Sequence, residues 1–147
     1  MENTMDKNFN NDEYIYLSLL HLGAVTWNKS SKRLLLALQY AVSDKSIMEN
    51  SVKHLYDQLA FLQKCTYGVI ERSLRYAIRQ LWECSKSECS KLLYHSTVTL
   101  HCPSVSEFIF LYASAFQRGI IQDWVDGLET QSKSPIRTDI MDILEMF

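Results

Sequence analysis

Apolar residues recur at helical spacing in one segment of this chain after another. Between residues 69 and 82 the sequence reads VIERSLRYAIRQLW, and its apolar positions lie three or four residues apart: Ile70, Leu74, Ala77, Ile78 and Leu81. This spacing is typical of a helix that buries one face. The 147 residues contain only four glycines and two prolines. Because helix breakers are so scarce, we predict an all-α fold.

Five further segments carry a similar pattern or a helix-end signal. Gly23 is expected to end the first helix, and Ser30 or Ser31 is expected to cap the second. Ser104 and Glu107 form an S-x-x-E capping box before an apolar run. The expected helices cover residues 13–23, 31–44, 51–64, 66–84, 87–95 and 102–119.

The chain divides into three parts on composition. Residues 1–12 are polar and are expected to form a disordered tail, and residues 13–120 form the helical domain. Residues 121–147 are expected to hold a linker, LETQSKSP, and then an amphipathic helix. That helix is a candidate interaction helix, which either docks on a partner or packs back on its own domain. Its apolar stripe includes Ile140, Ile143, Leu144 and Phe147.

Charge is distributed unevenly along the chain. The formal net charge is −2, but residues 14–120 carry twelve basic and seven acidic residues, a net charge of +5. Residues 1–13 and 121–147 have net charges of −3 and −4. An acidic segment at each end therefore hides a basic middle, which is compatible with a nucleic-acid partner.

Signals for other chemistry are weak. The four cysteines do not form a CxxC-like pair, so we expect buried thiols rather than a disulfide scaffold or a metal site. No phosphate loop, HExxH motif or serine nucleophile elbow is present, so we expect no catalytic residue, no cofactor, no small-molecule substrate and no enzyme activity. No apolar run is long enough to span a bilayer and the polar N-terminus is no secretory signal, so we expect a cytoplasmic protein without a membrane partner.

The helix expected over residues 66–84 has a second, cationic face. Arg72, Arg75 and Arg79 recur at helical spacing opposite the apolar face, after a very short connection, KCT. Ala60, ten residues before Ile70, completes the spacing of a helix-turn-helix, whose second helix enters the major groove. Lys64 stands where such turns usually have glycine, so it is expected to adopt a strained left-handed conformation. The arginine face is either a DNA-contacting surface or an ordinary solvated face.

The same residues carry a family resemblance. The segments HLGAVTWNKSSKRLLLALQYAV, KHLYDQLAFLQKCTYGVIERSLRYAIRQLW and PSVSEFIFLYASAF occur in this order between His21 and about Arg118. With its ERxxRxAIxxxW core, the chain resembles the C-terminal DNA-binding domain of the master sporulation response regulator of spore-forming Firmicutes. The resemblance implies a compact all-α domain of about six helices that contains a helix-turn-helix and binds short promoter elements.

The resemblance also implies a set of DNA-contacting residues. Glu71 would help to read bases, and Arg72 and Arg75 would contact bases or phosphates. The candidate DNA-binding residues are Thr66, Tyr67, Gly68, Val69, Glu71, Arg72, Arg75, Tyr76 and Arg79. The chain departs from the family where Val69 replaces an arginine that reads bases, where Tyr76 replaces a histidine, and where DQLAFLQ replaces a segment with two lysines.

Two functions follow from these observations. The first is a sequence-specific, DNA-binding transcriptional regulator of the sporulation-initiation type that lacks its own phosphoacceptor domain. Its partner is double-stranded DNA, bound by a homodimer or by tandem copies. The alternative is a protein–protein interaction module that kept the fold, lost DNA readout and modulates a related regulator. A DNA mimic that uses the acidic termini is a third, less favoured interpretation.

Overall fold

The computed structural model describes residues 9–23, 28–44, 52–96 and 101–132. Within these ranges the chain forms helices and no strand, which confirms the all-α prediction. The described helices are α1 (Asn11–Leu22), α2 (Lys29–Ser43), α4 (Val52–Gln63), α5 (Tyr67–Cys84), α6 (Lys86–Tyr94), α7 (Val105–Gln117) and α8 (Ile120–Ser132).

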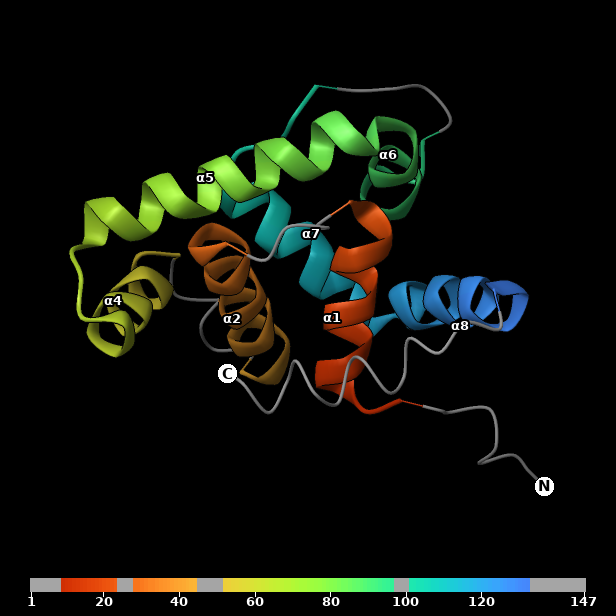
Figure 1. The fold of residues 1–147 in the computed structure, drawn as a ribbon, viewed down its shortest axis with the longest axis horizontal. Helices are drawn as coiled ribbons and strands as arrows, with labels where there is room; N and C mark the ends of the chain where they lie inside the picture. Colours follow the sequence, from red (N-terminus) through yellow and green to blue (C-terminus); the bar gives the residue numbers. More distant parts are fainter. Residues whose placement is uncertain (1–8, 24–27, 45–51, 97–100, 133–147) are drawn as a thin grey trace.

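Helices α2 and α7 form the centre of the molecule. Helix α2 packs against both α5 and α7, and α7 also contacts α5, α6 and α8. The long helix α5 crosses one side of the molecule, with α4 below its first turns and α6 at its far end (Figure 1). Helix α8 packs on α1 and α7 at the end opposite α4. This arrangement leaves the outer face of α5 uncovered by the other described helices.

The core is rich in aromatic and leucine side chains. Its largest fully buried members include Tyr16, Phe108 and Tyr112. The Tyr112 hydroxyl lies 2.5 Å from the Ser18 hydroxyl, which also donates to the carbonyl oxygen of Ile15 at 2.8 Å. Burial raises the pKa of Tyr112 far above its usual range, so the phenol stays neutral. These polar groups are therefore buried with partners, as a stable core requires.

A buried arginine connects three helices. Arg33 of α2 is 9% exposed, and its Nη1 donates to the Ser73 hydroxyl of α5 at 2.7 Å. Its Nε donates to Oε1 of Gln63 at the end of α4, over 3.4 Å. The guanidinium thus holds α4 and α5 against α2, and its planar donors suit two acceptors at once.

Most helix ends follow the predicted signals. Gly23 caps α1 with a φ of 119°, and Ser104 forms the predicted capping box with Glu107 before α7. The predicted cap of α2 is wrong, because the helix begins at Lys29 and its cap is Asn28 rather than Ser30 or Ser31. The Asn28 side chain accepts from the Ser31 N–H at 2.9 Å. Asparagine caps helices as well as serine does, and here its placement starts the helix two residues earlier than expected.

Regular structure begins earlier and continues later along the chain than the sequence predicts. Residues 9–12 belong to the fold rather than to a tail, since Phe9 is buried 5.5 Å from the ring of Tyr14 and Asn10 caps α1. Residues 128–132, expected to belong to a linker, continue α8.

Tertiary contacts explain why α8 forms despite its polar composition. Ile121 and Val125 are buried in the common core. The Tyr14 hydroxyl donates to Asp126 at 2.8 Å, and His21 Nε2 lies 2.6 Å from Glu129 Oε2. The helix is thus held to α1 along its length. The predicted apolar stripe over residues 140–147 lies outside the described residues, and the division of the chain at residue 120 stays a prediction.

Candidate nucleic-acid interface

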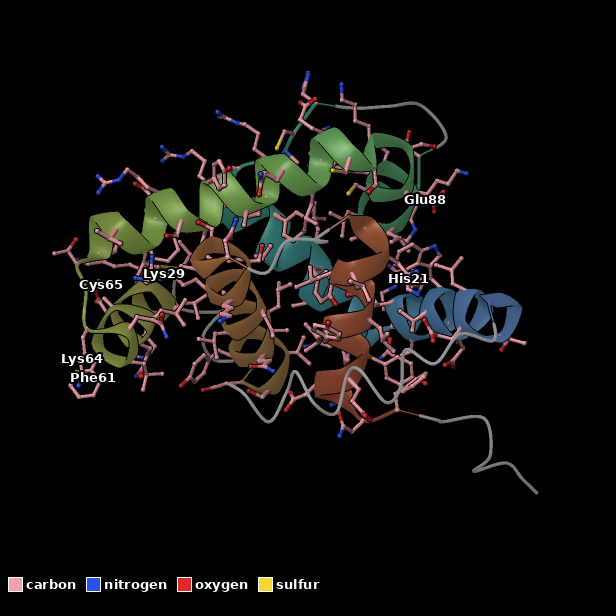
Figure 2. The ribbon with its side chains drawn as sticks, in the orientation of Figure 1. His21, Lys29, Phe61, Lys64, Cys65 and Glu88 are labelled. Carbon is pink, nitrogen blue, oxygen red and sulfur yellow. The ribbon has the colours of Figure 1, made fainter. Side chains whose placement is uncertain are left out.

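A tight turn joins α4 to α5. Lys64 has a φ of 53°, as predicted for the position where glycine is usual, and the Cys65 N–H donates to the Ala60 carbonyl at 3.0 Å. Thr66 caps α5, and its hydroxyl accepts from the Val69 N–H at 3.3 Å. The turn lies at the edge of the molecule, where Figure 2 shows Lys64 and Cys65 beside Phe61. The chain therefore turns sharply within three residues and presents the start of α5 at the surface.

Helix α5 buries one face and exposes the other, as its sequence predicts. Its apolar face is buried against α2, α4 and α7. Arg72, Arg75, Tyr76 and Arg79 are exposed on the opposite side. Neither Arg72 nor Arg79 forms an ion pair with a carboxylate in the described ranges, whereas Arg75 Nη2 lies 3.2 Å from Glu71 Oε2. Two guanidinium groups are therefore available to an external anion.

The first turn of α5 is less exposed than its middle. Gly68 and Val69 are half-buried, and Tyr67 is 38% exposed with its ring packed edge-on, 5.0 Å from that of Tyr56. Tyr76 is 52% exposed, and its hydroxyl accepts from the Gln80 amide at 3.0 Å. All nine candidate residues thus lie on or directly before α5, while the DNA contact expected of each stays a prediction.

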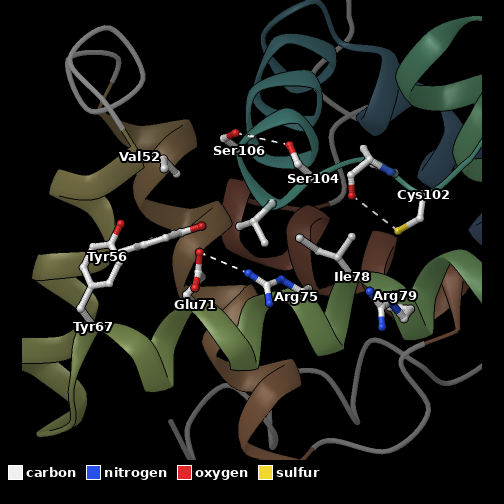
Figure 3. Close-up of a pocket in the computed structure, with 12 residues that line it drawn as sticks. Val52, Tyr56, Tyr67, Glu71, Arg75, Ile78, Arg79, Cys102, Ser104 and Ser106 are labelled. Atoms are coloured by element: carbon white, nitrogen blue, oxygen red, sulfur yellow. Dashed lines mark hydrogen bonds and ion pairs between the residues drawn. The ribbon is translucent and has the colours of Figure 1, made fainter.

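A pocket of about 510 Å³ runs along the flank of α5 toward the start of α7. We call it the α5–α7 pocket. Tyr56 and Tyr67 lie at one end, Arg79 and Cys102 lie at the other, and Glu71 and Arg75 lie between them (Figure 3). Its remaining lining residues are Val52, Ile78, Pro103, Ser104, Val105 and Ser106.

Electrostatic effects in this pocket follow from burial and from the neighbouring charges. Burial, and then the negative charge of Glu71, raise the pKa of Tyr56 to about 12. Burial also raises the pKa of the Cys102 thiol, and the positive charge of Arg79 opposes that rise. The pocket therefore contains a neutral phenol near a carboxylate at one end and an unpaired cation at the other.

Sequence reasoning missed this pocket. Its members come from α4, α5, the segment before α7 and the first turn of α7, and they span up to 54 positions between Val52 and Ser106. Only the packing of α7 against α5 brings Ser104 and Ser106 beside the arginine side chains of α5. No local motif in the sequence carries that information.

The described residues were compared with the requirements of a metal site and of a membrane-spanning helix. Among the described residues, no group of three or more His, Cys, Asp or Glu side chains could hold a metal ion. No helix in the described ranges is both long and apolar enough to cross a membrane.

Replacing Thr66 by alanine should destabilise the fold by about 1 kcal/mol, because the Val69 N–H loses its acceptor at the start of α5. Thr66→Ser keeps a capping hydroxyl and should retain most of the stability. Urea denaturation of the three proteins measures the difference. An equal loss in both variants would show that the methyl group, rather than the cap, is what matters.

These features define a class of protein: an all-α domain in which a tight turn presents a cationic helix beside a second helix. The chain belongs to the family "Sporulation initiation factor Spo0A C terminal", whose model matches residues 15–116. This is a family of DNA-binding helix-turn-helix domains rather than of enzymes, so the resemblance is confirmed. The match covers α2 to α6 completely and ends one residue before the end of α7, so α8 follows it. No curated protein matches the chain.

Proposed function

We propose that this chain is a sequence-specific, DNA-binding regulator of transcription that places α5 in the major groove. The observation that carries the proposal is the exposed face of Arg72, Arg75 and Arg79, directly after the turn, in a member of a DNA-binding family. Arginine reads guanine with two parallel hydrogen bonds and also binds phosphate, which dominates affinity for DNA. The regulator would act on chromosomal DNA in the cytoplasm, as a homodimer or as tandem copies.

The start of α5 would face the base edges, because recognition helices contact bases mainly through their first turns. Val69 is half-buried there and has no hydrogen-bond donor in its side chain. Its methyl groups can contact the C5-methyl of thymine but cannot bind guanine. We therefore expect a target sequence that differs from that of family members with arginine at this position.

Fluorescence anisotropy with duplex DNA tests the proposal, after selection of a target from random sequences. If the three arginines neutralise about three phosphates, affinity should fall roughly 40-fold between 50 and 200 mM salt. A recovered motif together with this salt dependence would support sequence-specific binding. The absence of salt-dependent binding at micromolar protein would overturn the proposal.

A second candidate function is supported by a different surface. Phe61 is 82% exposed and Leu62 is 48% exposed at the end of α4, and solvent-exposed side chains of this size are typical of protein contacts. On this interpretation the chain binds a related regulator. Light scattering of the chain mixed with an effector domain of the same family would show a complex that Phe61→Lys abolishes. Two separate masses would exclude this function.

A further inference from the structure

The α5–α7 pocket combines features that the proposed DNA contact does not require. We propose that it binds a free mononucleotide, with the base against Tyr67 and the phosphate at Arg75, where Arg79 adds a second positive charge. This proposal does not depend on the proposed function, because the ligand is small and binds without DNA. The volume of about 510 Å³ lies in the range of small-molecule sites, and the lining mixes apolar, aromatic and charged groups as such sites do.

The tyrosine end of the pocket suits a flat ring. Tyr67 is partly exposed, and its ring is held by the edge-on contact with Tyr56 at 5.0 Å. An aromatic face fixed in this way stacks on a nucleic-acid base of any sequence. Glu71, whose side chain is 41% exposed, can accept a hydrogen bond from a base N–H, and the protonated phenol of Tyr56 can donate one. These groups recognise a base rather than a simple anion.

The part of the pocket around Arg75 suits a phosphate. Arg79 is exposed and makes no ion pair with a described carboxylate, while Arg75 offers the donors that Glu71 leaves unused. The Ser106 hydroxyl lies 3.4 Å from that of Ser104 and can turn toward an anion. Guanidinium groups bind phosphate with charge-assisted hydrogen bonds. Among the described residues that line the pocket, Glu71 is the one carboxylate, so the two arginines give this lining a net positive charge.

The proposed positions of the base and the phosphate are separated by a distance that suits a mononucleotide. Tyr67 and Arg75 are eight residues apart on one helix, which corresponds to about 12 Å along its axis. A mononucleotide spans a comparable length from the far edge of its base to its phosphate. If the proposed function also holds, the bound nucleotide would compete with DNA for Arg75 and Arg79, and the two ligands would weaken each other's binding equally.

Isothermal titration calorimetry without DNA tests the proposal. The ligands are AMP, GMP, CMP and UMP, with ribose 5-phosphate, inorganic phosphate and adenosine as matched controls. We expect at least one mononucleotide to bind tenfold or more tightly than ribose 5-phosphate and adenosine, with amide NMR shifts at Tyr67, Glu71 and Ser106. Equal affinity for the nucleotides and ribose 5-phosphate would overturn the proposal, as would shifts that fall elsewhere.

A charge variant tests the phosphate end. Ser106→Glu puts a carboxylate into the pocket, where it should weaken nucleotide binding at least tenfold, while a negative charge in the first turn favours α7 itself. Gln117→Glu makes the same charge change at the exposed far end of α7 and should leave binding unchanged. Equal effects of the two variants would place the nucleotide elsewhere. Because DNA is absent, none of these outcomes depends on whether the chain also binds DNA.

Discussion

Replacing Arg72 by alanine should weaken binding to the selected DNA by about 5- to 150-fold, which corresponds to about 1–3 kcal/mol. The reason is that Arg72 is exposed on the outer face of α5 and has no carboxylate partner in the described part of the chain. The loss therefore removes a DNA contact without breaking an internal one. Anisotropy with the selected duplex measures the affinity, and thermal unfolding confirms that the variant is folded.

Arg118→Ala is the matched control, because Arg118 carries the same charge on an exposed site at the end of α7, where it contacts His95 at 3.3 Å. Its removal should change affinity much less. Arg75→Ala should weaken binding at least as strongly as Arg72→Ala, since it leaves the Glu71 carboxylate unpaired near the DNA phosphates. If Arg72→Ala and Arg118→Ala lose affinity equally, α5 does not enter the groove.

Replacing Gly23 by alanine should lower the free energy of unfolding by about 2–4 kcal/mol, the largest stability effect that we expect from a single methyl group. Gly23 has a φ of 119°, which side-chain-bearing residues rarely adopt. A Cβ at this position would also lie 2.6 Å from the Cβ of Cys84 at the end of α5. The added methyl must therefore displace one of two packed helix ends, and urea denaturation will report the cost.

Gly127→Ala should change the free energy of unfolding in the opposite direction. Gly127 lies within α8 and is exposed, and an added Cβ would meet no described atom within 4 Å outside the adjacent backbone of its own helix. Alanine there should stabilise the protein by about 0.5–1 kcal/mol, because it restricts the unfolded chain and favours the helix. A similar change in stability at both glycines would contradict the strain and the close contact that we assign to Gly23.

The parts of the fold predicted from sequence are those set by local signals. The two faces of α5, the left-handed Lys64 and the capping box at Ser104 all depend on residues within a few positions of one another. Hydrogen-bond geometry and helical periodicity act over that range, so these features can be predicted from the amino-acid sequence alone.

The parts that were missed depend on distant contacts. No helix was predicted over residues 120–132, and residues 128–132 were assigned to a linker, yet the burial of Ile121 and Val125 and the packing on α1 stabilise α8 there. The α5–α7 pocket joins side chains from three elements, and no spacing in the sequence relates Tyr56 to Ser106. The candidate DNA-contacting residues lie on or directly before a single helix and could be proposed from sequence, whereas a pocket between helices could not.

The hydrogen bond from Arg33 to Ser73 determines the direction in which the arginine side chains of α5 point. Successive residues of a helix point about 100° apart around its axis, so holding one side chain sets the azimuth of all the others. Ser73 directly follows Arg72 in sequence, and its bond to the buried guanidinium of α2 fixes α5 against rolling about its own axis. The orientation of Arg72 and Arg79 relative to a ligand therefore depends on Arg33, a buried residue that the ligand would not contact.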